Sequence, residues 1–568
     1  MEVGLDSAMP TYSGGLGVLA GDTLRAAADM GLPMIGVTLL NRKGYFRQHL
    51  DVQGNQTESP VLWEPEKFLQ PLETRVAVQI EGRNVNIRLW CYMLSGAFGQ
   101  QVPVYFMDTF LPENTPWDQT LTDFLYGGDN RYRLCQEVVL GMGGIAALRA
   151  LGYKDFKAYH MNEGHPALLI LSLLEEQIDQ LHLTCVTPAC VQDVRKLCVF
   201  TTHTPVAAAT DQFPIELARQ VLGEEHTSTL LLASCFNNNM LNMTYLGLCF
   251  SHYINGVSMR NEEISRGMYP NYPINSITNG VHIGTWAADS FCRLYDQHIP
   301  EWRRDNLYLR YIISISEEEI QQAHAEAKQD LIKMVEKRSG VLLDKSAMTL
   351  GFARRATGYK RADLLFSDIN RLKNIAASAG PLQLIFGGKA HPHDEGGKEI
   401  IRSIFRAAEQ LKNVMRVIYL EEYDMEIAKY ICSGVDLWLN TPKKPEEASG
   451  TSGMKAALNG VPSLSVLDGW WVEGHVEGAT GWSIGEGWEL ESNPDQEIAS
   501  LYDKLEFVIL PLFYKKPLAY AWVMRNAIAL NGSYYNSQRM LFQYVKNAYF
   551  PHNNFENLDL QKSVTGSK

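Results

Sequence analysis

The chain has 568 residues, 46% hydrophobic and 20% charged, a composition typical of a globular protein that is long enough for more than one domain. Its 51 basic and 64 acidic residues give a net charge of −13, which argues against nucleic acid or a membrane surface as a partner, and no apolar run reaches the ~18 residues of a membrane helix. The nine cysteines are dispersed, without a CxxC pair, and the N-terminus does not resemble a signal peptide, so we expect reduced thiols in a cytoplasmic protein.

The first half of the chain mixes predicted strands and helices. Hydrophobic periodicity predicts strands at 37–40, 102–107 and 197–202 and an amphipathic helix at 131–151. Ser316 and Glu319 form a capping box at the start of a long polar helix that we expect to end at Gly340. This helix is interpreted as a connector between domains.

The second half alternates apolar, strand-like runs with helical stretches. Strands are predicted at 348–353, 382–386, 416–420, 435–439 and 462–467. The alternation indicates an α/β fold, a parallel sheet with helices on both faces, in which ligands bind at the carboxyl ends of the strands. The C-terminal region is predicted to form two amphipathic helices broken at Gly532.

A glycine-rich turn lies near the start of the chain, in YSGGLGVLAGD at residues 12–22. Gly15-Leu-Gly17-Val-Leu-Ala20 fits the G-x-G-x-x-G/A pattern, whose glycines let a phosphate approach backbone N–H groups at a helix N-terminus. An NAD site also needs an acidic residue ~20 positions further on, at the end of the next strand, and that strand ends in Asn41-Arg42. A phosphate or sugar phosphate is therefore favoured over NAD, with an ordinary strand–helix turn as the alternative.

A basic run, FARRATGYKRAD, directly follows the predicted strand at 348–353. A solvated surface is the usual explanation of such a run, but this one stands where an α/β sheet binds its ligand. Arginine forks and a lysine point charge are the usual means of holding phosphate. The cations of the run are Arg354, Arg355, Lys360 and Arg361. Together with the glycine turn, they suggest a phosphate clamped between two domains.

A loop of small residues, EASGTSGMKAALNG, follows the strand at 435–439. Small residues that enter a helix form an anion site, and Lys455, just inside that helix, is a candidate Schiff-base lysine. An ordinary capped helix with a surface lysine fits the same residues. Glu447 precedes the loop.

This loop resembles the pyridoxal-phosphate signature of the α-glucan (glycogen, starch or maltodextrin) phosphorylases, and it is closer to their short bacterial and archaeal branch than to the animal enzymes. The glycine turn resembles the loop that this family places at the substrate phosphate. Further motifs fall in the family order over nearly the whole chain: NEGHPAL at 162–168, THT around His203, TNGV around Asn279, GYKR ending at Arg361 and GGKAHP from Gly387.

The resemblance implies an enzyme that cleaves the terminal α-1,4 bond of a glucan with inorganic phosphate and releases glucose 1-phosphate with retention. It implies the GT-B architecture, two Rossmann-like domains with the active site in the cleft between them. The implied cofactor is pyridoxal 5′-phosphate as a Schiff base on Lys455, with its own phosphate exchanging a proton with the substrate phosphate near a second pKa of ~6. Homodimers are common in the family, although the sequence does not set the oligomeric state.

The resemblance also assigns roles by position. Glu447, His203 and Asn279 match residues that hydrogen-bond the glucosyl unit. The phosphate ligands that it implies are Arg355 and Lys360 for the substrate and cofactor phosphates, Arg354 beside the cofactor phosphate, the amides of Gly14 and Gly15 at the substrate phosphate, and Gly450 and Thr451 around the cofactor or sugar.

Two positions depart from the animal enzymes, which have an arginine where Asp424 stands and a histidine where Thr357 stands. We interpret both as features of the short branch. Relatives carry a full strand before the glycine turn, where this chain has only residues 1–8, so we expect an N-terminally short chain that is less stable or less active than its motifs promise.

The expected domains are an N-terminal Rossmann-like domain at 1–290, a helical connector at 291–345, a C-terminal Rossmann-like domain at 346–515, and C-terminal helices at 516–568 that pack back across both domains.

His391 and His393 lack the spacing of a closed zinc site, so no metal is expected. Trp470 and Trp471 fit either a sugar cleft or a core.

Two competing functions remain. A nucleotide-sugar glycosyltransferase of the same architecture, such as a glycogen synthase, shares the glycine-rich loop but lacks Lys455 in this context. An inactive glucan-binding protein is disfavoured by the presence of Lys455, Arg355, Lys360 and Glu447.

Overall fold

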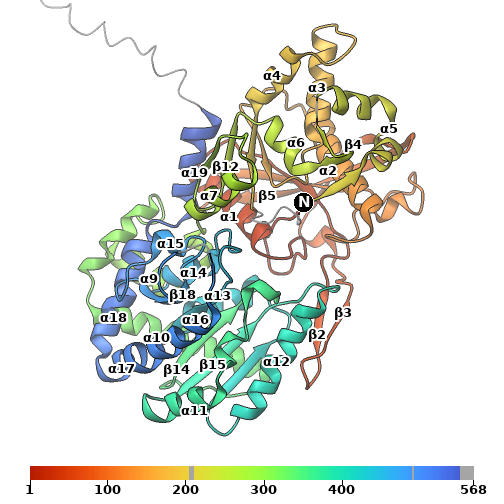
Figure 1. Ribbon diagram of the computed structural model, residues 1–568. Coiled ribbons are helices and arrows are strands. Elements are labelled where there is room, and N and C mark those ends of the chain that lie inside the picture. Colours follow the sequence, from red (N-terminus) through yellow and green to blue (C-terminus); the bar gives the residue numbers. More distant parts are fainter. Residues whose placement is uncertain (204–209, 234, 489–490, 551–568) are drawn as a thin grey trace, which may run out of the picture.

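The protein is described by a computed structural model (Figure 1) over residues 1–203, 210–233, 235–488 and 491–550. Its large sheets are two of four strands, both in the first half of the chain, and one of six strands in the second half. In Figure 1 the first half lies at the upper right and most of the second half at the lower left. Among the described residues, no helix has the length and apolarity needed to cross a membrane.

The first four-stranded sheet has the order β1-β6-β5-β4. Its strands are β1 (Gly36–Leu39), β4 (Gln70–Ile80), β5 (Arg83–Ser95) and β6 (Gln101–Asp108). Only the β1–β6 pair is parallel, and β4 to β6 form an antiparallel meander. Helix α2 (Asn130–Ala150) packs against β4 and against α3 (Leu169–Gln180), and its middle is buried on every side.

The second four-stranded sheet is parallel throughout, in the order β13-β12-β8-β7. Its strands are β7 (Tyr159–Asn162), β8 (Cys198–Thr201), β12 (Tyr253–Gly256) and β13 (Ile274–Ser276). The other elements of this half are α1 (Gly15–Met30), α4 (Pro188–Leu197), β9 (Gln212–Pro214), α5 (Ile215–Leu232), β10 (Phe236–Asn237), β11 (Met240–Asn242), α6 (Met243–Cys249), α7 (Met259–Met268), α8 (Ile283–Trp286) and α9 (Asp289–His298).

The six-stranded sheet is parallel and has the order β16-β15-β14-β17-β18-β19. Numbered from its first strand, this is the order 3-2-1-4-5-6 of a dinucleotide-binding fold, in which ligands bind where the order reverses. The reversal lies between β14 and β17. The strands are β14 (Met348–Ala353), β15 (Leu382–Gly387), β16 (Arg416–Leu420), β17 (Leu437–Asn440), β18 (Ser463–Val466) and β19 (Gly481–Ile484).

Helices pack against this sheet and complete the second half. They are α10 (Glu317–Ser339), α11 (Ile369–Ser378), α12 (Glu395–Leu411), α13 (Met425–Gly434), α14 (Thr451–Ala457), α15 (Trp471–Gly474), α16 (Pro494–Asp503), α17 (Leu510–Lys515), α18 (Pro517–Asn526) and α19 (Ser537–Tyr544). The predicted strands of both halves are confirmed to within about two residues. β19 and, in the first half, every strand other than β1, β6 and β8 were not predicted.

The capping box predicted for the long polar helix is confirmed in α10. The hydroxyl of Ser316 accepts from the backbone N–H of Glu319 at 3.3 Å and donates to its carboxylate at 2.8 Å. The helix ends at Gly340, whose φ of 70° is the left-handed conformation that glycine adopts most readily.

A hairpin of the first half reaches the six-stranded sheet. Its strands are β2 (Arg47–Leu50) and β3 (Gln56–Ser59), which run beside α12 in Figure 1. The amide of Gln48 donates to Gly388 O at 2.9 Å, and Gln56 forms two hydrogen bonds with the backbone of Ala390 at 2.9 and 3.0 Å. These buried amides join the two halves of the chain.

The C-terminal helix α19 packs against α1 of the first half. The hydroxyl of Tyr544 lies 3.0 Å from Nδ2 of Asn255, at the end of β12. The guanidinium of Arg539 donates to the carbonyls of Thr278 and Asn279 at 2.7 and 2.9 Å. The chain that follows the six-stranded sheet thus returns to support the parallel sheet of the first half.

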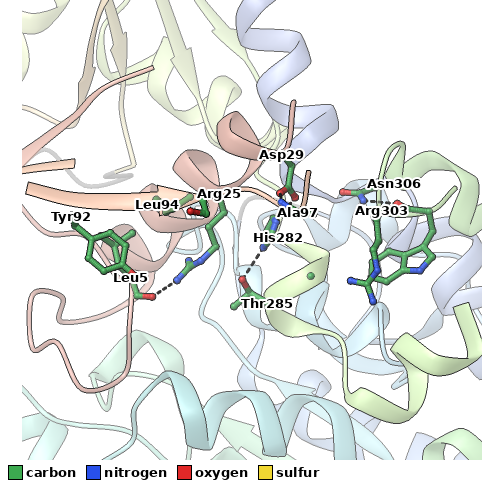
Figure 2. Close-up of a pocket in the computed structure, with 13 residues that line it drawn as sticks. Leu5, Arg25, Asp29, Tyr92, Leu94, Ala97, His282, Thr285, Arg303 and Asn306 are labelled. Atoms are coloured by element: carbon green, nitrogen blue, oxygen red, sulfur yellow. Dashed lines mark hydrogen bonds and ion pairs between the residues drawn. The ribbon is translucent and has the colours of Figure 1, made fainter. Parts of the chain in front are cut away.

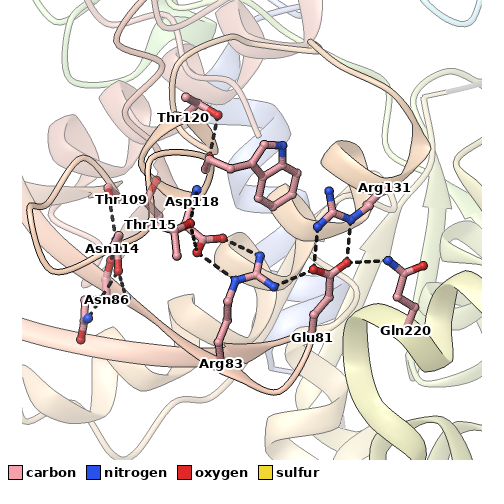
Figure 3. Close-up of polar contacts among 11 residues, drawn as sticks. Glu81, Arg83, Asn86, Thr109, Asn114, Thr115, Asp118, Thr120, Arg131 and Gln220 are labelled. Carbon is pink, nitrogen blue, oxygen red and sulfur yellow. Dashed lines mark hydrogen bonds and ion pairs between the residues drawn. The ribbon is translucent and has the colours of Figure 1, made fainter.

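An ionic cluster fixes the turn between β4 and β5 (Figure 3). The carboxylate of Glu81 accepts two hydrogen bonds from Arg131 at 2.6 Å and one from Arg83, also at 2.6 Å. Arg83 pairs in turn with Asp118 at 2.7 Å, and the Arg131 guanidinium stacks 4.1 Å from the ring centroid of Trp117. The hydrogen bonds from Arg131 are the largest cause that lowers the pKa of Glu81, to about 2.

We predict that Glu81→Ala lowers the free energy of unfolding by about 1–3 kcal/mol, because it leaves charged donors without their acceptor. The matched control is Glu64→Ala, which removes an exposed pair with Lys67 and should cost about 0–1 kcal/mol. Because the folded pKa of Glu81 is lowered, its contribution is present above its unfolded pKa and is lost as pH falls from about 4.5 toward 2. Urea unfolding at pH 7 and pH 3 measures both effects, and equal losses in the two variants would contradict the prediction.

Candidate functional site

The two chemistry-bearing loops of the second half meet where the strand order of the six-stranded sheet reverses. Arg354 is the first residue after β14, and Asn440 is the last residue of β17. The guanidinium of Arg354 donates to the side-chain oxygen of Asn440. The prediction that the basic run stands at a ligand-binding strand end is therefore consistent with the position of the run in the sheet.

Two cations converge on one carboxylate oxygen. Oε2 of Glu447 lies 2.6 Å from Nη2 of Arg354 and 2.6 Å from Nζ of Lys360, and all three side chains are buried. One negative charge cannot neutralise two positive charges, so the cluster carries surplus positive charge away from water. Such a surplus favours a bound anion, because charges act strongly where water is excluded.

The surplus charge acts on the protonation of Lys360. Burial, and then repulsion by Arg354, lower the pKa of Lys360 to about 7. Burial alone would raise the pKa of Glu447, but Arg354 and Lys360 lower it below its ordinary value. Near neutral pH this lysine is therefore poised between its charged and neutral forms.

The backbone of Glu447 is fixed by Asp468, which follows β18. Its carboxylate accepts from the backbone N–H of Glu447 and from that of Gly469, both at 2.9 Å. Burial, with the nearby charge of Glu447 adding to it, raises the pKa of Asp468 to about 7. No sequence motif marks Asp468, since its role depends on a contact with a loop twenty-one residues earlier.

Lys455 lies on α14, which begins after Gly450. Gly450 has a φ of 89°, in the region that favours glycine, and Thr451 is the first residue of the helix. The Lys455 side chain is buried, with the residue 7% exposed, and its Nζ lies 3.5 Å from the ring centroid of Trp286. Lys455 forms no ion pair with any described residue, and burial lowers its pKa. The prediction of an ordinary surface lysine is wrong.

The glycine turn forms the start of α1, with Gly14 as its N-cap. The buried carboxylate of Glu2 accepts from the backbone N–H of Ser13 at 2.6 Å and of Gly14 at 3.3 Å, and from the hydroxyl of Tyr126 at 2.8 Å. An added Cβ at Gly15 would meet no atom within 4 Å. The turn therefore has open space beside both Gly14 and Gly15, but the amide of Gly14 already donates to Glu2.

The glycine turn also contacts the second half. The Tyr12 hydroxyl accepts from the backbone N–H of Met425 at 3.0 Å, at the start of α13. Asp424 caps that helix by accepting from Ile427 N at 2.8 Å, and burial raises the pKa of its carboxyl. The departure from the animal enzymes at position 424 thus has a local role as a helix cap.

The parallel sheet of the first half presents His203 and Asn279 after the carboxyl ends of β8 and β13. His203 Nε2 lies 2.6 Å from Oδ1 of Asn162, and burial lowers the pKa of the imidazole to about 3. The rest of the THTP motif, residues 204 and 205, lies outside the described residues. Asn279 is buried, and its Oδ1 has no hydrogen-bond partner among the described residues.

Segments that follow the strands of the two parallel sheets are hydrogen-bonded to each other. The hydroxyl of Ser258, just after β12, donates to Ala448 O at 2.7 Å, one residue from Glu447. The hydroxyl of Thr278, next to Asn279, donates to Glu473 at 2.7 Å. Sequence motifs that lie far apart in the chain are therefore gathered at one place, although among the described residues no hydrogen bond or ion pair joins His203 to the cluster of Arg354, Lys360 and Glu447.

Other residues singled out in the sequence have simpler positions. Arg355 is exposed, close enough to Tyr45 and His391 for its charge to act on their pKa values. Trp470 and Trp471 are buried in the main hydrophobic core, so of their two interpretations the core is the one observed. Within the described residues, no group of three or more His, Cys, Asp or Glu side chains is arranged to hold a metal ion.

Sequence reasoning missed four contributors to the site: Asp468, described above, and Glu2, Asp22 and Trp286. Asp22 is the last residue of the quoted glycine-turn stretch, and its carboxylate accepts from Trp286 Nε1 at 2.8 Å. The signal was present as an acidic residue inside an apolar helix, but its partner lies 264 positions away. Trp286 lies a few residues after the TNGV motif, but no pattern in the nearby sequence indicates its contact with Lys455.

Comparison with known proteins finds one matching family model and several relatives whose similarity extends over nearly the whole chain. The family model for carbohydrate phosphorylases matches residues 223–479. The maltodextrin phosphorylase of Thermococcus litoralis is 37% identical over 97% of this chain and 70% of its own length. The glycogen phosphorylase of Aquifex aeolicus is 35% identical over 96% of this chain and 85% of its own length, and that of Mycobacterium tuberculosis is 34% identical over 97% and 70%.

Two glycines of the turn should respond differently to substitution. A Cβ at Gly17 would lie 2.7 Å from Oε2 of Glu2 and 2.8 Å from Cβ of Tyr12, so Gly17→Ala should lower the free energy of unfolding by about 1–3 kcal/mol through overpacking. Gly15→Ala is the matched control, because its Cβ meets open space, and it should leave stability unchanged or raise it by up to about 1 kcal/mol. Urea unfolding of both variants decides the matter: a loss at Gly15 as large as that at Gly17 would refute the packing described.

Proposed function

Because the chain belongs to the carbohydrate phosphorylase family, we propose that it is an α-1,4-glucan phosphorylase, which uses inorganic phosphate to release α-D-glucose 1-phosphate from the end of a glucan. The observation that carries the proposal is the pairing of a buried lysine without an ion pair, Lys455, with a nearby cluster of surplus positive charge around Glu447. The first suits a carbonyl cofactor and the second suits phosphate.

The proposed architecture is GT-B, with an N-terminal domain at 1–290, a connector at 291–345, a C-terminal domain at 346–515 and C-terminal helices at 516–568. The active site would lie in the cleft between the two domains. The hydrogen bond between Ser258 and Ala448 supports this division, since it joins segments that follow strands of two parallel sheets, one from each proposed domain. All nine cysteines are free thiols, which supports a reducing compartment such as the cytoplasm.

The residues around Lys455 fit pyridoxal 5′-phosphate as the cofactor. Lys455 would hold its aldehyde carbon, and Arg354, Gly450 and Thr451 would hold its phosphate. One observation supports the fit: the Ser449 hydroxyl is buried without a hydrogen-bond partner among the described residues. When bound, the cofactor supplies a phosphate monoester whose second pKa of ~6 suits acid–base exchange with a second phosphate near neutral pH.

The substrate phosphate would be held from both sides. Arg355 and Lys360 would bind it from the C-terminal domain, and the glycine turn would bind it from the N-terminal domain through first-turn N–H groups, which have no partner inside the helix. Both glycines have open space beside them, but the amide of Gly14 already donates to Glu2 at 3.3 Å. We therefore assign the larger share of the contact to Gly15.

The glucosyl unit would be bound by Glu447, His203 and Asn279. The orphaned Oδ1 of buried Asn279 supports this role, because a sugar hydroxyl could donate to it. His203 is neutral near pH 7, since burial lowers the pKa of its ring to about 3, so it would position the sugar by hydrogen bonding rather than act as an acid. Carboxylate and phosphate charges near the anomeric carbon would stabilise an oxocarbenium-like transition state.

The cation cluster also explains how two phosphates could share the site. Two dianions in contact repel each other strongly where water is excluded. Arg354 and Lys360 share a single carboxylate at rest, and Arg355 forms no ion pair with any described residue. Their surplus charge is available to offset that repulsion.

Two other functions are distinguishable from this one. A nucleotide-sugar glycosyltransferase of the glycogen-synthase type would use the same architecture without a cofactor lysine, and a glucan-binding protein would need neither cation cluster nor lysine. The burial of Lys455 against Trp286 favours the phosphorylase over both, because a buried lysine without a partner is costly unless it has a chemical role.

The direct test is phosphate-dependent release of glucose 1-phosphate from maltoheptaose or glycogen. The wild-type protein should release it, and Lys455→Ala should lower the rate at least about 10³-fold, since the residue is assigned to hold the cofactor. Lys443→Ala, an exposed lysine of the preceding loop, is the control and should retain activity. Glucan binding without release by the wild type would support the glucan-binding protein instead, and glucosyl transfer from a nucleotide sugar would support the synthase.

The pH dependence of phosphate binding should trace to Lys360. Its pKa is lowered to about 7, so the cationic form that binds phosphate is lost as pH rises through 7, and the KM for phosphate should rise on the alkaline side. Lys360→Arg keeps its charge at all these pH values, so that rise should be much smaller in this variant, while Lys443→Arg should behave as wild type. An equal rise of the KM for phosphate above pH 7 in the wild type and in Lys360→Arg would contradict this assignment.

A further inference from the structure

Lys455 is buried against an aromatic ring and forms no ion pair with a carboxylate of the described residues. Its Nζ stands 3.5 Å from the ring centroid of Trp286. A buried ammonium needs compensation, and an indole face supplies part of it, because a desolvated cation–π contact is worth up to about 2 kcal/mol. The position and orientation of the Trp286 ring therefore bear directly on Lys455.

The Trp286 ring is fixed at both its side chain and its backbone. Its Nε1 donates to Oδ2 of Asp22 at 2.8 Å. Its carbonyl accepts from Nδ2 of Asn459 at 2.9 Å, and the same amide nitrogen donates to Lys455 O, also at 2.9 Å. Asn459 thus ties the backbones of the tryptophan and the lysine together, which leaves Asp22 to set the rotation of the ring.

Asp22 is a buried carboxylate, 1% exposed, on the helix that begins with the glycine turn. Besides Trp286 Nε1 it accepts from the backbone N–H of His282 at 3.2 Å, and Arg25 lies 3.4 Å from its Oδ1. Its charge is the largest of those that raise the pKa of Lys455 against the lowering by burial; Cys432 acts in the same direction and Arg25 in the opposite one. Asp22 therefore acts on Lys455 in two ways: it orients the Trp286 ring, and its negative charge favours the charged form of the lysine.

We propose that Asp22 and Trp286 are positioning residues of the cofactor lysine: Asp22 fixes the indole, and the indole face holds the Lys455 amine in place. The proposal rests on the proposed function, which makes Lys455 the cofactor lysine. It has a structural consequence, because α1 then carries both the glycine turn for the substrate phosphate and the carboxylate that orders the cofactor side. One helix, α1, then sets the distance between the substrate-phosphate site and the cofactor lysine.

Asp29, on the same helix, provides a matched control (Figure 2). Its side chain is 9% exposed, and its carboxylate accepts from Ala97 N at 2.7 Å and lies 2.8 Å from Nε2 of His282. It lines a cavity of about 300 Å³ together with Arg25 and His282. It shares with Asp22 the helix and the partner His282 and is somewhat more exposed, but among the described residues it has no hydrogen bond to Trp286, and it is not among the charges that shift the pKa of Lys455.

The test compares Asp22→Asn, Trp286→Phe and Asp29→Asn with wild type. The first readout is competitive labelling of the cofactor-free protein with acetic anhydride as a function of pH, followed by mass spectrometry of the Lys455 peptide. Asn keeps the size and an acceptor for the indole but removes the charge, so Lys455 should become reactive at a pH about one unit lower in Asp22→Asn. Asp29→Asn should match wild type.

The second readout is the rate at which bound pyridoxal phosphate is lost on dialysis, followed by its visible absorption. Phe keeps an aromatic face but lacks the N–H that Asp22 orients, so Trp286→Phe should release pyridoxal about tenfold faster than wild type or Asp29→Asn. Near-ultraviolet circular dichroism verifies that each variant is folded. If Asp22→Asn does not fold, Trp286→Phe carries the test through both readouts, because loss of the fixed ring should also speed its labelling.

The outcomes separate the two proposals. A wild-type protein that takes up no pyridoxal would overturn the proposed function, while the labelling profile would still decide whether Asp22 and Trp286 govern the Lys455 amine. Pyridoxal uptake by wild type, with Lys455 labelling and release unchanged in Asp22→Asn and Trp286→Phe, would overturn the positioning role alone. Equal effects of Asp22→Asn and Asp29→Asn would assign the change to general loosening of α1, which also overturns it.

Discussion

The constraint on which the rest of the site depends is the sharing of one carboxylate by two buried cations. Arg354 and Lys360 both contact Oε2 of Glu447 at 2.6 Å, in a place from which water is largely excluded. Such a cluster is costly to build, and a folded protein retains it only where the surrounding structure holds the groups in place. Asp468 fixes the backbone of Glu447, and Asn440 engages Arg354. The arrangement is thus held by the strand ends themselves and is ready for an anion.

The fold supplies that rigidity through its topology. The strand order reverses between β14 and β17, which leaves room at their carboxyl ends for two loops to face each other. The first half of the chain contacts this region through the hydrogen bonds of Ser258 with Ala448 and of Tyr12 with Met425. Helix α19 then returns to brace the first half through Arg539. Each of these contacts joins segments that are distant in sequence.

The sequence could predict much of the second half because its signals are local. Buried parallel strands appear as apolar runs, and the predicted strands at 348–353 and 416–420 coincide with β14 and β16. The capping box of α10 has the same local character. By contrast, the β2–β3 hairpin depends on buried amides, Gln48 and Gln56, whose partners are backbone atoms of the other half, and no local pattern marks it.

The residues of the site divide in the same way, into those with a local sequence signal and those that depend on distant contacts. Lys455, Lys360 and Arg354 were found from motifs that follow strands, and the glycine turn was found from its spacing. The residues that tune them were not found: Glu2 beneath the turn, and Asp22 and Trp286 beside the lysine. Their contribution exists only through contacts across the fold, of which the Asp22–Trp286 bond spans 264 positions. The position of Glu2 also explains why Gly14 and Gly15 are not equivalent.

The central claim is that Lys455 is a buried amine kept free to bind a carbonyl cofactor beside a cationic phosphate site. The measurement that tests it most directly is reduction of the purified protein with borohydride, followed by digestion and mass spectrometry of the peptides. The account predicts one pyridoxyl phosphate group per chain, on Lys455. Its absence from Lys455 after incubation with pyridoxal 5′-phosphate, or its presence mainly on exposed lysines such as Lys443, would contradict the account.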